Sequence, residues 1–143
     1  MTAIPAAIQL RKLWWAGPLT ILTAVIGVLI IRSIAMSILP APYAPGLAMI
    51  AIPVVLTLVL CTGAVLVYAL VGRFAKNPIR TYLIIASVFL AVSFIPDFLA
   101  VSAPMPGAGW PYSITLMIMH VVAGLITVYM LIQLTVNRNP WKE

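Results

Sequence analysis

The stretch that decides the fold is residues 79–101, which read IRTYLIIASVFLAVSFIPDFLAV. After Arg80 it carries no charge until Asp97, and a helix that crosses a lipid bilayer needs about 20 consecutive, mostly apolar residues. The stretch therefore predicts a transmembrane helix. A carboxylate inside such a helix is costly unless it is paired or hydrated, so Asp97 also marks a candidate functional site.

The composition of the whole chain extends this interpretation. Of 143 residues, 64% are hydrophobic and 7% are charged, whereas about 25% of residues are charged in a typical soluble domain. So much apolar surface indicates that a lipid bilayer surrounds the protein. Further spans are expected at about residues 18–39, 47–71 and 112–136. The prediction is one domain over residues 1–143, an all-α bundle of four transmembrane helices in up-down-up-down order.

Proline and glycine set the expected limits of these helices. Segments rich in both residues, at 40–46 and 102–111, interrupt the apolar runs and predict two loops on one side of the membrane. Pro53 falls inside the second expected span and predicts a kink there. A short interfacial segment is expected at about residues 4–15, where two basic residues adjoin two tryptophans.

The net charge is +6, and the positions of the basic residues agree with the expected topology. Seven of the eight basic residues fall on one side of a four-span chain: Arg11, Lys12, Arg73, Lys76, Arg80, Arg138 and Lys142. Because basic residues concentrate on the cytoplasmic side, both termini are expected in the cytoplasm of a bacterium, with the protein in its inner membrane. No basic stripe is present, so nucleic acid is excluded as a partner.

Three ionisable residues are expected at one depth of the membrane. At 1.5 Å per residue, Arg32, Asp97 and His120 each lie about 10–13 Å below the outer end of their helix. Ser93 lies four residues before Asp97 and shares its face. We expect these side chains to converge in the outer half of the bundle.

Two interpretations of this convergence stay open. In the first, Arg32, Ser93, Asp97 and His120 form a site that binds or acts on a small amphiphilic molecule, with Arg32 holding an anionic or carbonyl group. His120 and Asp97 are then the candidate catalytic pair, suited to a base or a pH sensor. In the second, an Arg32–Asp97 ion pair only fixes helix packing in a non-enzymatic subunit or scaffold, which packs against a membrane partner or a copy of itself.

Other chemistries have weaker support. A single His and one Asp make a poor zinc site, so no metal is expected. Cys61 is the only cysteine, which excludes an intramolecular disulfide. A small proton-coupled transporter is less favoured, because such proteins rely on a glutamate in their first helix, where this chain has Arg32. The sequence leaves open which cofactor the protein uses, if any, and whether it is an enzyme.

Two short motifs resemble a known family. Ser-Phe-Ile-Pro-Asp at 93–97 and Leu-Met-Ile-Met-His at 116–120 lie on the last two expected helices. They resemble an uncharacterised family of small bacterial four-helix integral membrane proteins, a domain of unknown function found in actinobacteria and relatives. The resemblance implies a small bacterial inner-membrane protein and supplies no activity and no catalytic residues.

Overall fold

The computed structural model describes residues 8–40, 47–104 and 106–136. In these ranges the chain forms four long helices: α1 (Leu13–Ile38), α3 (Ala51–Phe74), α4 (Pro78–Leu99) and α5 (Trp110–Thr135). Two short 3-10 turns, η1 (Leu10–Lys12) and η3 (Ala100–Ser102), adjoin α1 and α4. Each of the four helices is long and apolar enough to cross a membrane. The predicted all-α bundle of four spans is confirmed.

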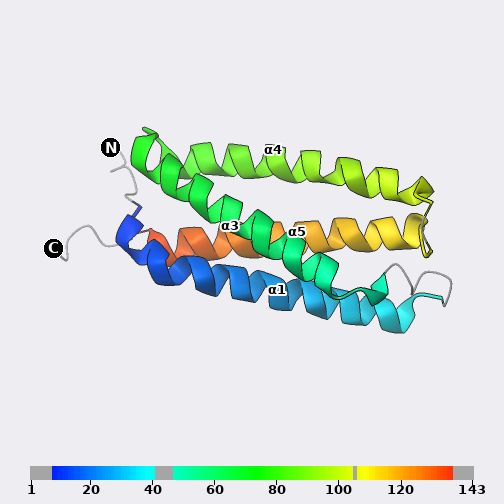
Figure 1. Cartoon of the computed structure of the whole chain (residues 1–143). Coiled ribbons are helices and arrows are strands. Elements are labelled where there is room, and N and C mark those ends of the chain that lie inside the picture. The colour runs from blue at the N-terminus through cyan, green and yellow to red at the C-terminus, as the bar shows by residue number, and fades with distance from the viewer. Residues whose placement is uncertain (1–7, 41–46, 105, 137–143) are drawn as a thin grey trace.

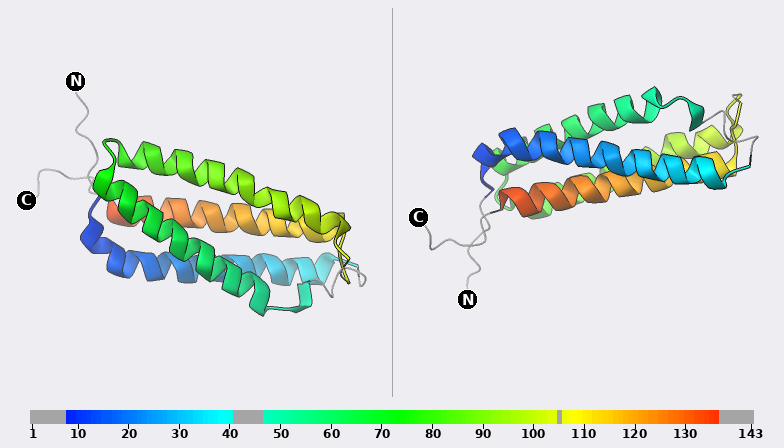
Figure 2. Two further views of the ribbon diagram at one scale, coloured as in Figure 1. Left: turned by 45° about the horizontal axis from the view of Figure 1, so that its top comes forward. Right: turned by 90° about the horizontal axis from the view of Figure 1, so that it is seen from below.

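The four helices run up and down along one axis, with α3 crossing obliquely (Figures 1 and 2). The start of α1 and the end of α5 lie at the same end, called here the terminal end, together with the turn between α3 and α4. Ile8 forms an antiparallel bridge with Val136, and the Gln9 amide donates to the Thr135 carbonyl at 2.9 Å. The opposite end, where α1 ends and α5 begins, is called the loop end.

Helices α1 and α5 pack most closely at Gly27. A Cβ atom at this position would lie 2.7 Å from Cδ1 of Ile126 and 3.3 Å from Cγ1 of Val122, both on α5. Small residues at helix interfaces allow such close approach in membranes, where packing rather than the hydrophobic effect drives helix association. Gly27 therefore sets the spacing of this pair.

Helix α3 is tied to its neighbours at the terminal end. The rings of Tyr68 and Tyr82, on α3 and α4, pack edge to face with centroids 4.6 Å apart. The hydroxyl groups of Tyr68 and Thr135 lie 2.7 Å apart, and Thr135 donates to the Leu131 carbonyl at 2.6 Å. All four residues are buried. This cluster joins α3, α4 and α5 at the terminal end.

Two helix starts differ from the sequence prediction. The first helix begins at Leu13 rather than near residue 18, and it continues through Pro18. The second begins at Ala51 rather than near residue 47, so Pro53 lies in its first turn. A proline in the first turn costs no hydrogen bond, because amides there have no partner within the helix. Pro53 thus lies in the first part of the helix, as expected, but at a position where it breaks no hydrogen bond and gives no reason for the expected kink.

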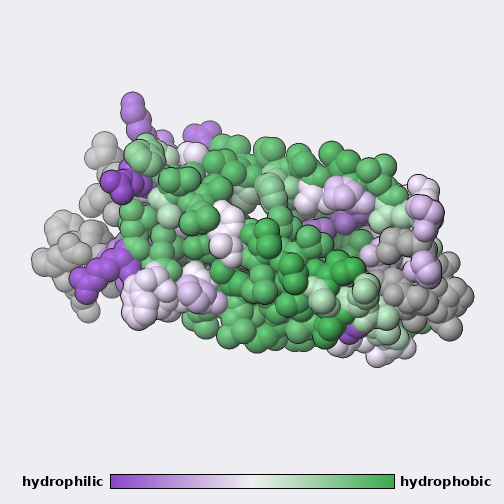
Figure 3. Space-filling view, in the orientation of Figure 1, coloured by the Kyte–Doolittle hydropathy of each residue, from purple (hydrophilic) through white to green (hydrophobic). Residues whose placement is uncertain are grey.

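The expected interfacial segment at residues 4–15 is only partly described, because residues 1–7 lie outside the described ranges. Its later part is not a separate helix: η1 continues directly into α1. Within the described ranges the basic side chains, other than Arg32, gather at the terminal end, as the purple atoms in Figure 3 show. Arg138 and Lys142 lie outside these ranges.

Candidate functional site

A cavity of about 430 Å³ lies between α3 and α4, with α5 as its floor. Only Ala75, Lys76 and Asn77 separate α3 from α4, so the two helices meet at the terminal end. From there they diverge toward the loop end, where α3 approaches α1 (Figure 1). The space-filling view shows the surface hollowed between them, with polar atoms within an otherwise apolar face (Figure 3). The cavity therefore opens sideways, toward lipid.

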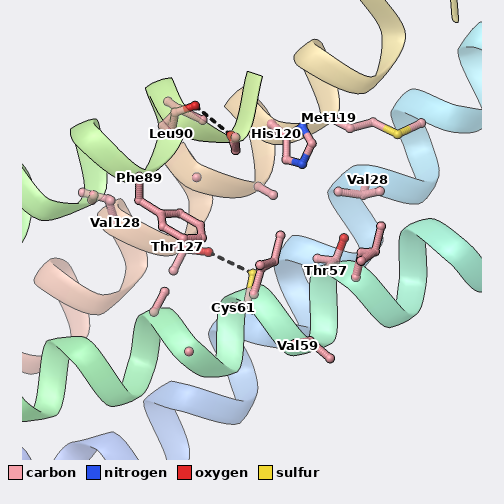
Figure 4. A pocket seen from close by; sticks show the side chains of 18 of the residues that line it. Val28, Thr57, Val59, Cys61, Phe89, Leu90, Met119, His120, Thr127 and Val128 are labelled. Carbon is pink, nitrogen blue, oxygen red and sulfur yellow. Dashed lines mark hydrogen bonds between the residues drawn. The ribbon is translucent and has the colours of Figure 1, made fainter. Parts of the chain in front are cut away.

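The wall of the cavity is mainly apolar. Its polar groups come from three helices: Thr57 and Cys61 from α3, Tyr82 and Ser93 from α4, and His120 and Thr127 from α5. Figure 4 labels four of them, Thr57, Cys61, His120 and Thr127. Between them lie aliphatic and aromatic side chains, among them Leu56, Phe89, Leu116, Met119 and Val128. A pocket of this kind, largely apolar with a few polar groups, is typical of small-molecule sites.

The main polar feature beside the cavity is the contact between His120 and Asp97. Nδ1 of His120 lies 2.8 Å from Oδ2 of Asp97. The Asp97 side chain is 4% exposed and that of His120 is 26% exposed, and only His120 lines the cavity. The Asp97 carboxylate thus binds Nδ1 of the ring from outside the cavity. Within the described chain, Nε2 of the ring has no hydrogen-bond partner.

Two hydroxyl groups in the cavity wall, those of Ser93 and Thr57, donate to their own helices. Ser93 donates to the Leu90 carbonyl at 2.7 Å, and Thr57 donates to the Pro53 carbonyl at 2.7 Å. Such bonds are the usual way in which Ser and Thr are satisfied within a helix. Each hydroxyl hydrogen is therefore used within its helix, and each oxygen keeps lone pairs free.

Deeper in the cavity, Sγ of Cys61 lies 3.4 Å from Oγ1 of Thr127 (Figure 4). This contact joins α3 to α5. Gly63, two residues further along α3 toward the terminal end, also lines the cavity. A Cβ atom at Gly63 would meet no described heavy atom within 4 Å, so this position faces open space.

Arg32 does not join the site, and the expected convergence of all three ionisable groups is wrong. Its Nε donates to the Leu47 carbonyl at 2.8 Å, and its Nη2 donates to the Ala48 carbonyl at 2.9 Å. Both carbonyls belong to helical residues that come before α3 and are separated from it by Met49 and Ile50. The guanidinium satisfies these carbonyls and ties α1 to the start of α3, so the expected Arg32–Asp97 ion pair is not formed.

Within the described ranges, no three His, Cys, Asp or Glu side chains gather as a metal site would require. The chemistry available at the cavity is therefore that of one imidazole–carboxylate pair and a few hydroxyl and thiol groups. An arrangement of this kind can bind and orient a polar group and can exchange a proton with it.

The fold and this cavity define a multi-pass membrane protein with a laterally open, mainly apolar pocket. The chain belongs to a family of unknown function, DUF6069, whose sequence pattern matches residues 8–136. The expected resemblance to an uncharacterised family is confirmed. No curated protein and no solved structure matches the chain.

Proposed function

We propose that this protein binds a small amphiphilic molecule in the cavity between α3 and α4. The observation that carries the proposal is an apolar cavity of about 430 Å³ with one imidazole–carboxylate pair at its wall. Ligand pockets typically enclose about 300–1,000 Å³ and combine an apolar wall with a few polar groups. The apolar part of the ligand occupies the space near Gly63, and its polar group contacts His120.

The ligand enters from the lipid phase. The cavity opens between α3 and α4, where lining side chains such as Val59 and Phe89 are more than half exposed in the isolated chain. In a membrane these side chains face acyl chains. A molecule that partitions into the bilayer therefore reaches the cavity by moving sideways.

We also propose that the protein lies in a bacterial cytoplasmic membrane with both termini in the cytoplasm. The support is the basic terminal end, since basic residues concentrate on the cytoplasmic side. A reporter fused after Glu143 tests the orientation. Green fluorescent protein should fluoresce there and alkaline phosphatase should be inactive; an active phosphatase would overturn the orientation.

The second candidate is a non-enzymatic membrane subunit whose polar groups only fix the packing. Arg32 favours it, because both hydrogen bonds of this side chain go to backbone carbonyls of the same chain. The Asp97–His120 contact also joins two helices. The cavity separates the candidates, because packing alone does not require an open space beside His120.

Native mass spectrometry of the full chain in mild detergent tests the proposal. Wild type should carry a small molecule that Gly63→Leu lacks, because a leucine side chain at this position occupies the space assigned to the apolar part of the ligand. Thr62→Leu is the matched control: Thr62 is the neighbouring residue, is exposed and does not line the cavity, so this variant should keep the molecule. A wild-type protein without a bound molecule, or one that carries another polypeptide, would overturn the proposal and favour the subunit.

A further inference from the structure

We infer that the cavity selects molecules whose polar group is an uncharged hydrogen-bond acceptor, such as a ketone or ester carbonyl. The inference rests on the proposed function and identifies the chemical class of the ligand. Three observations carry it: the position of Arg32, the contact between Asp97 and His120, and the hydrogen bonds of the wall hydroxyls.

The first step concerns charge. Arg32 is bound to the carbonyls of Leu47 and Ala48, and the other described basic side chains gather at the terminal end. No Lys or Arg of the described chain lines the cavity. An anionic head group would therefore meet only the His120–Asp97 pair, which already contains a carboxylate. A buried charge without a partner is expensive in lipid, so carboxylates and phosphates are disfavoured.

The second step concerns the proton on His120. Because a buried net charge is expensive in lipid, the His120–Asp97 pair is most stable when its net charge is zero. A neutral pair holds two exchangeable protons, shared among the two ring nitrogens and the two carboxyl oxygens. One proton lies between Nδ1 and Oδ2, which are 2.8 Å apart. The second proton lies on Nε2, because on Oδ1 of Asp97, whose side chain is only 4% exposed, it would form a hydroxyl with no acceptor in the described chain. This placement holds whether the pair is imidazolium–carboxylate or an imidazole that accepts the carboxylic acid hydrogen from Oδ2. In both forms Nε2 carries a hydrogen that is free to bond a ligand.

The third step concerns the rest of the wall. Ser93 and Thr57 have already donated their hydroxyl hydrogens to Leu90 and Pro53. Beside His120 these two oxygens can only accept unless they give up those bonds. The Nε2 hydrogen is therefore a donor left without a partner in the described chain, and a ligand satisfies it by presenting an oxygen lone pair.

The cavity is too large for one very small molecule to fill it. A buried apolar cavity of about 150 Å³ holds one benzene molecule, and this cavity is about three times larger. A carbonyl carried on a long alkyl chain or a ring system matches it. Three probes that share a ten-carbon alkyl chain separate the alternatives: decyl methyl ketone, undecanoic acid and decane, each with a diazirine at the same carbon.

The experiment is photolabelling of the full chain in lipid nanodiscs near neutral pH, with labelled peptides mapped by mass spectrometry. The ketone should label cavity residues of α3, α4 and α5 at least about tenfold more than the acid or the alkane, as expected for one satisfied hydrogen bond in a desolvated site. Gly63→Leu should abolish this labelling, and Thr62→Leu should retain it. His120→Phe should reduce the ketone to the level of the alkane.

The outcomes distinguish the two proposals. Equal or stronger labelling of the cavity by the acid would overturn the inference of an uncharged acceptor and would leave cavity binding intact. Equal labelling by the ketone and the alkane in wild type would show that His120 makes no bond to the probe, which would also overturn the inference. Failure of all three probes to label the cavity would overturn the binding proposal and this inference together.

Discussion

His120 and Asp97 meet at 2.8 Å between Nδ1 and Oδ2 and join α5 to α4 beside the cavity. Because Asp97 is 3% exposed, its loss leaves Nδ1 of the ring without a partner in an apolar setting. Asp97→Ala should lower the free energy of unfolding by about 1–2 kcal/mol. Unfolding in mixed micelles with increasing dodecyl sulfate measures this change.

Ser33→Ala is the control for Asp97→Ala. Ser33 is exposed, and its hydroxyl donates only to the Leu29 carbonyl of its own helix. Its replacement should change the free energy of unfolding by less than about 0.5 kcal/mol. If Asp97→Ala were as mild as this control, the contact with His120 would contribute nothing to stability.

The placement of Arg32 predicts which substitutions act independently. Arg32→Leu removes two hydrogen bonds from a charged donor and should lower the free energy of unfolding by about 1.5–3 kcal/mol. Its effect should add to that of Asp97→Ala within about 0.5 kcal/mol, because the two side chains share no partner. Asp97→Ala and His120→Ala should instead be coupled, since either one removes the same contact.

Two double-mutant cycles measure this difference. A coupling of more than about 1 kcal/mol between Arg32 and Asp97 would indicate the ion pair that the sequence suggested. That result would contradict the hydrogen bonds of Arg32 to Leu47 and Ala48.

The same substitution at two helical glycines should have different effects. Gly27→Leu places a side chain where even a Cβ would lie 2.7 Å from Ile126, so it should destabilise the protein by about 1–3 kcal/mol through overpacking. Gly63→Leu places the leucine side chain in the cavity. It also removes a glycine from a helix interior, which alone should raise the free energy of unfolding by about 0.5–1 kcal/mol. Gly63→Leu should therefore be neutral or stabilising while it abolishes binding, and equal destabilisation at both positions would argue against an open space at Gly63.

The hydroxyl of Tyr68 should matter for stability, and that of Tyr129 should not. Tyr68→Phe removes the buried bond to Thr135 at 2.7 Å and should cost about 0.5–1.5 kcal/mol. Tyr129 lies on the same helix as Thr135 and is 65% exposed, so Tyr129→Phe is the matched control. Thermal unfolding in detergent compares them, and identical midpoints would contradict the role of Tyr68 in joining α3 to α5.

The four spans were predictable because uncharged apolar runs of about 20 residues have few structural solutions other than a membrane helix. The helix starts were harder to place. By sequence, Pro18 indicates a helix start and Pro53 indicates a kink. In the structure, α1 continues through Pro18, and Pro53 lies in the first turn of α3. Sequence alone did not separate these cases.

The candidate site was only partly predictable, because spacing along a helix gives depth and not direction. Asp97, His120 and Arg32 were placed at one depth, and the structure brings the first two together. Arg32 instead meets the carbonyls of Leu47 and Ala48, which come before the start of α3. The cavity depends on the oblique course of α3, which results from packing between helices and has no local sequence signal.

The most direct test of cavity binding uses the fact that His120 is the only histidine in the chain. Protein labelled with 15N-histidine in nanodiscs gives one imidazole, whose nitrogen shifts report which ring atoms carry hydrogen. We predict a protonated Nε2 whose signal moves as decyl methyl ketone is added to wild type or Thr62→Leu, and stays unchanged in Gly63→Leu. An Nε2 signal in wild type that does not respond to the ketone would contradict a binding site in which the polar group of the ligand contacts His120.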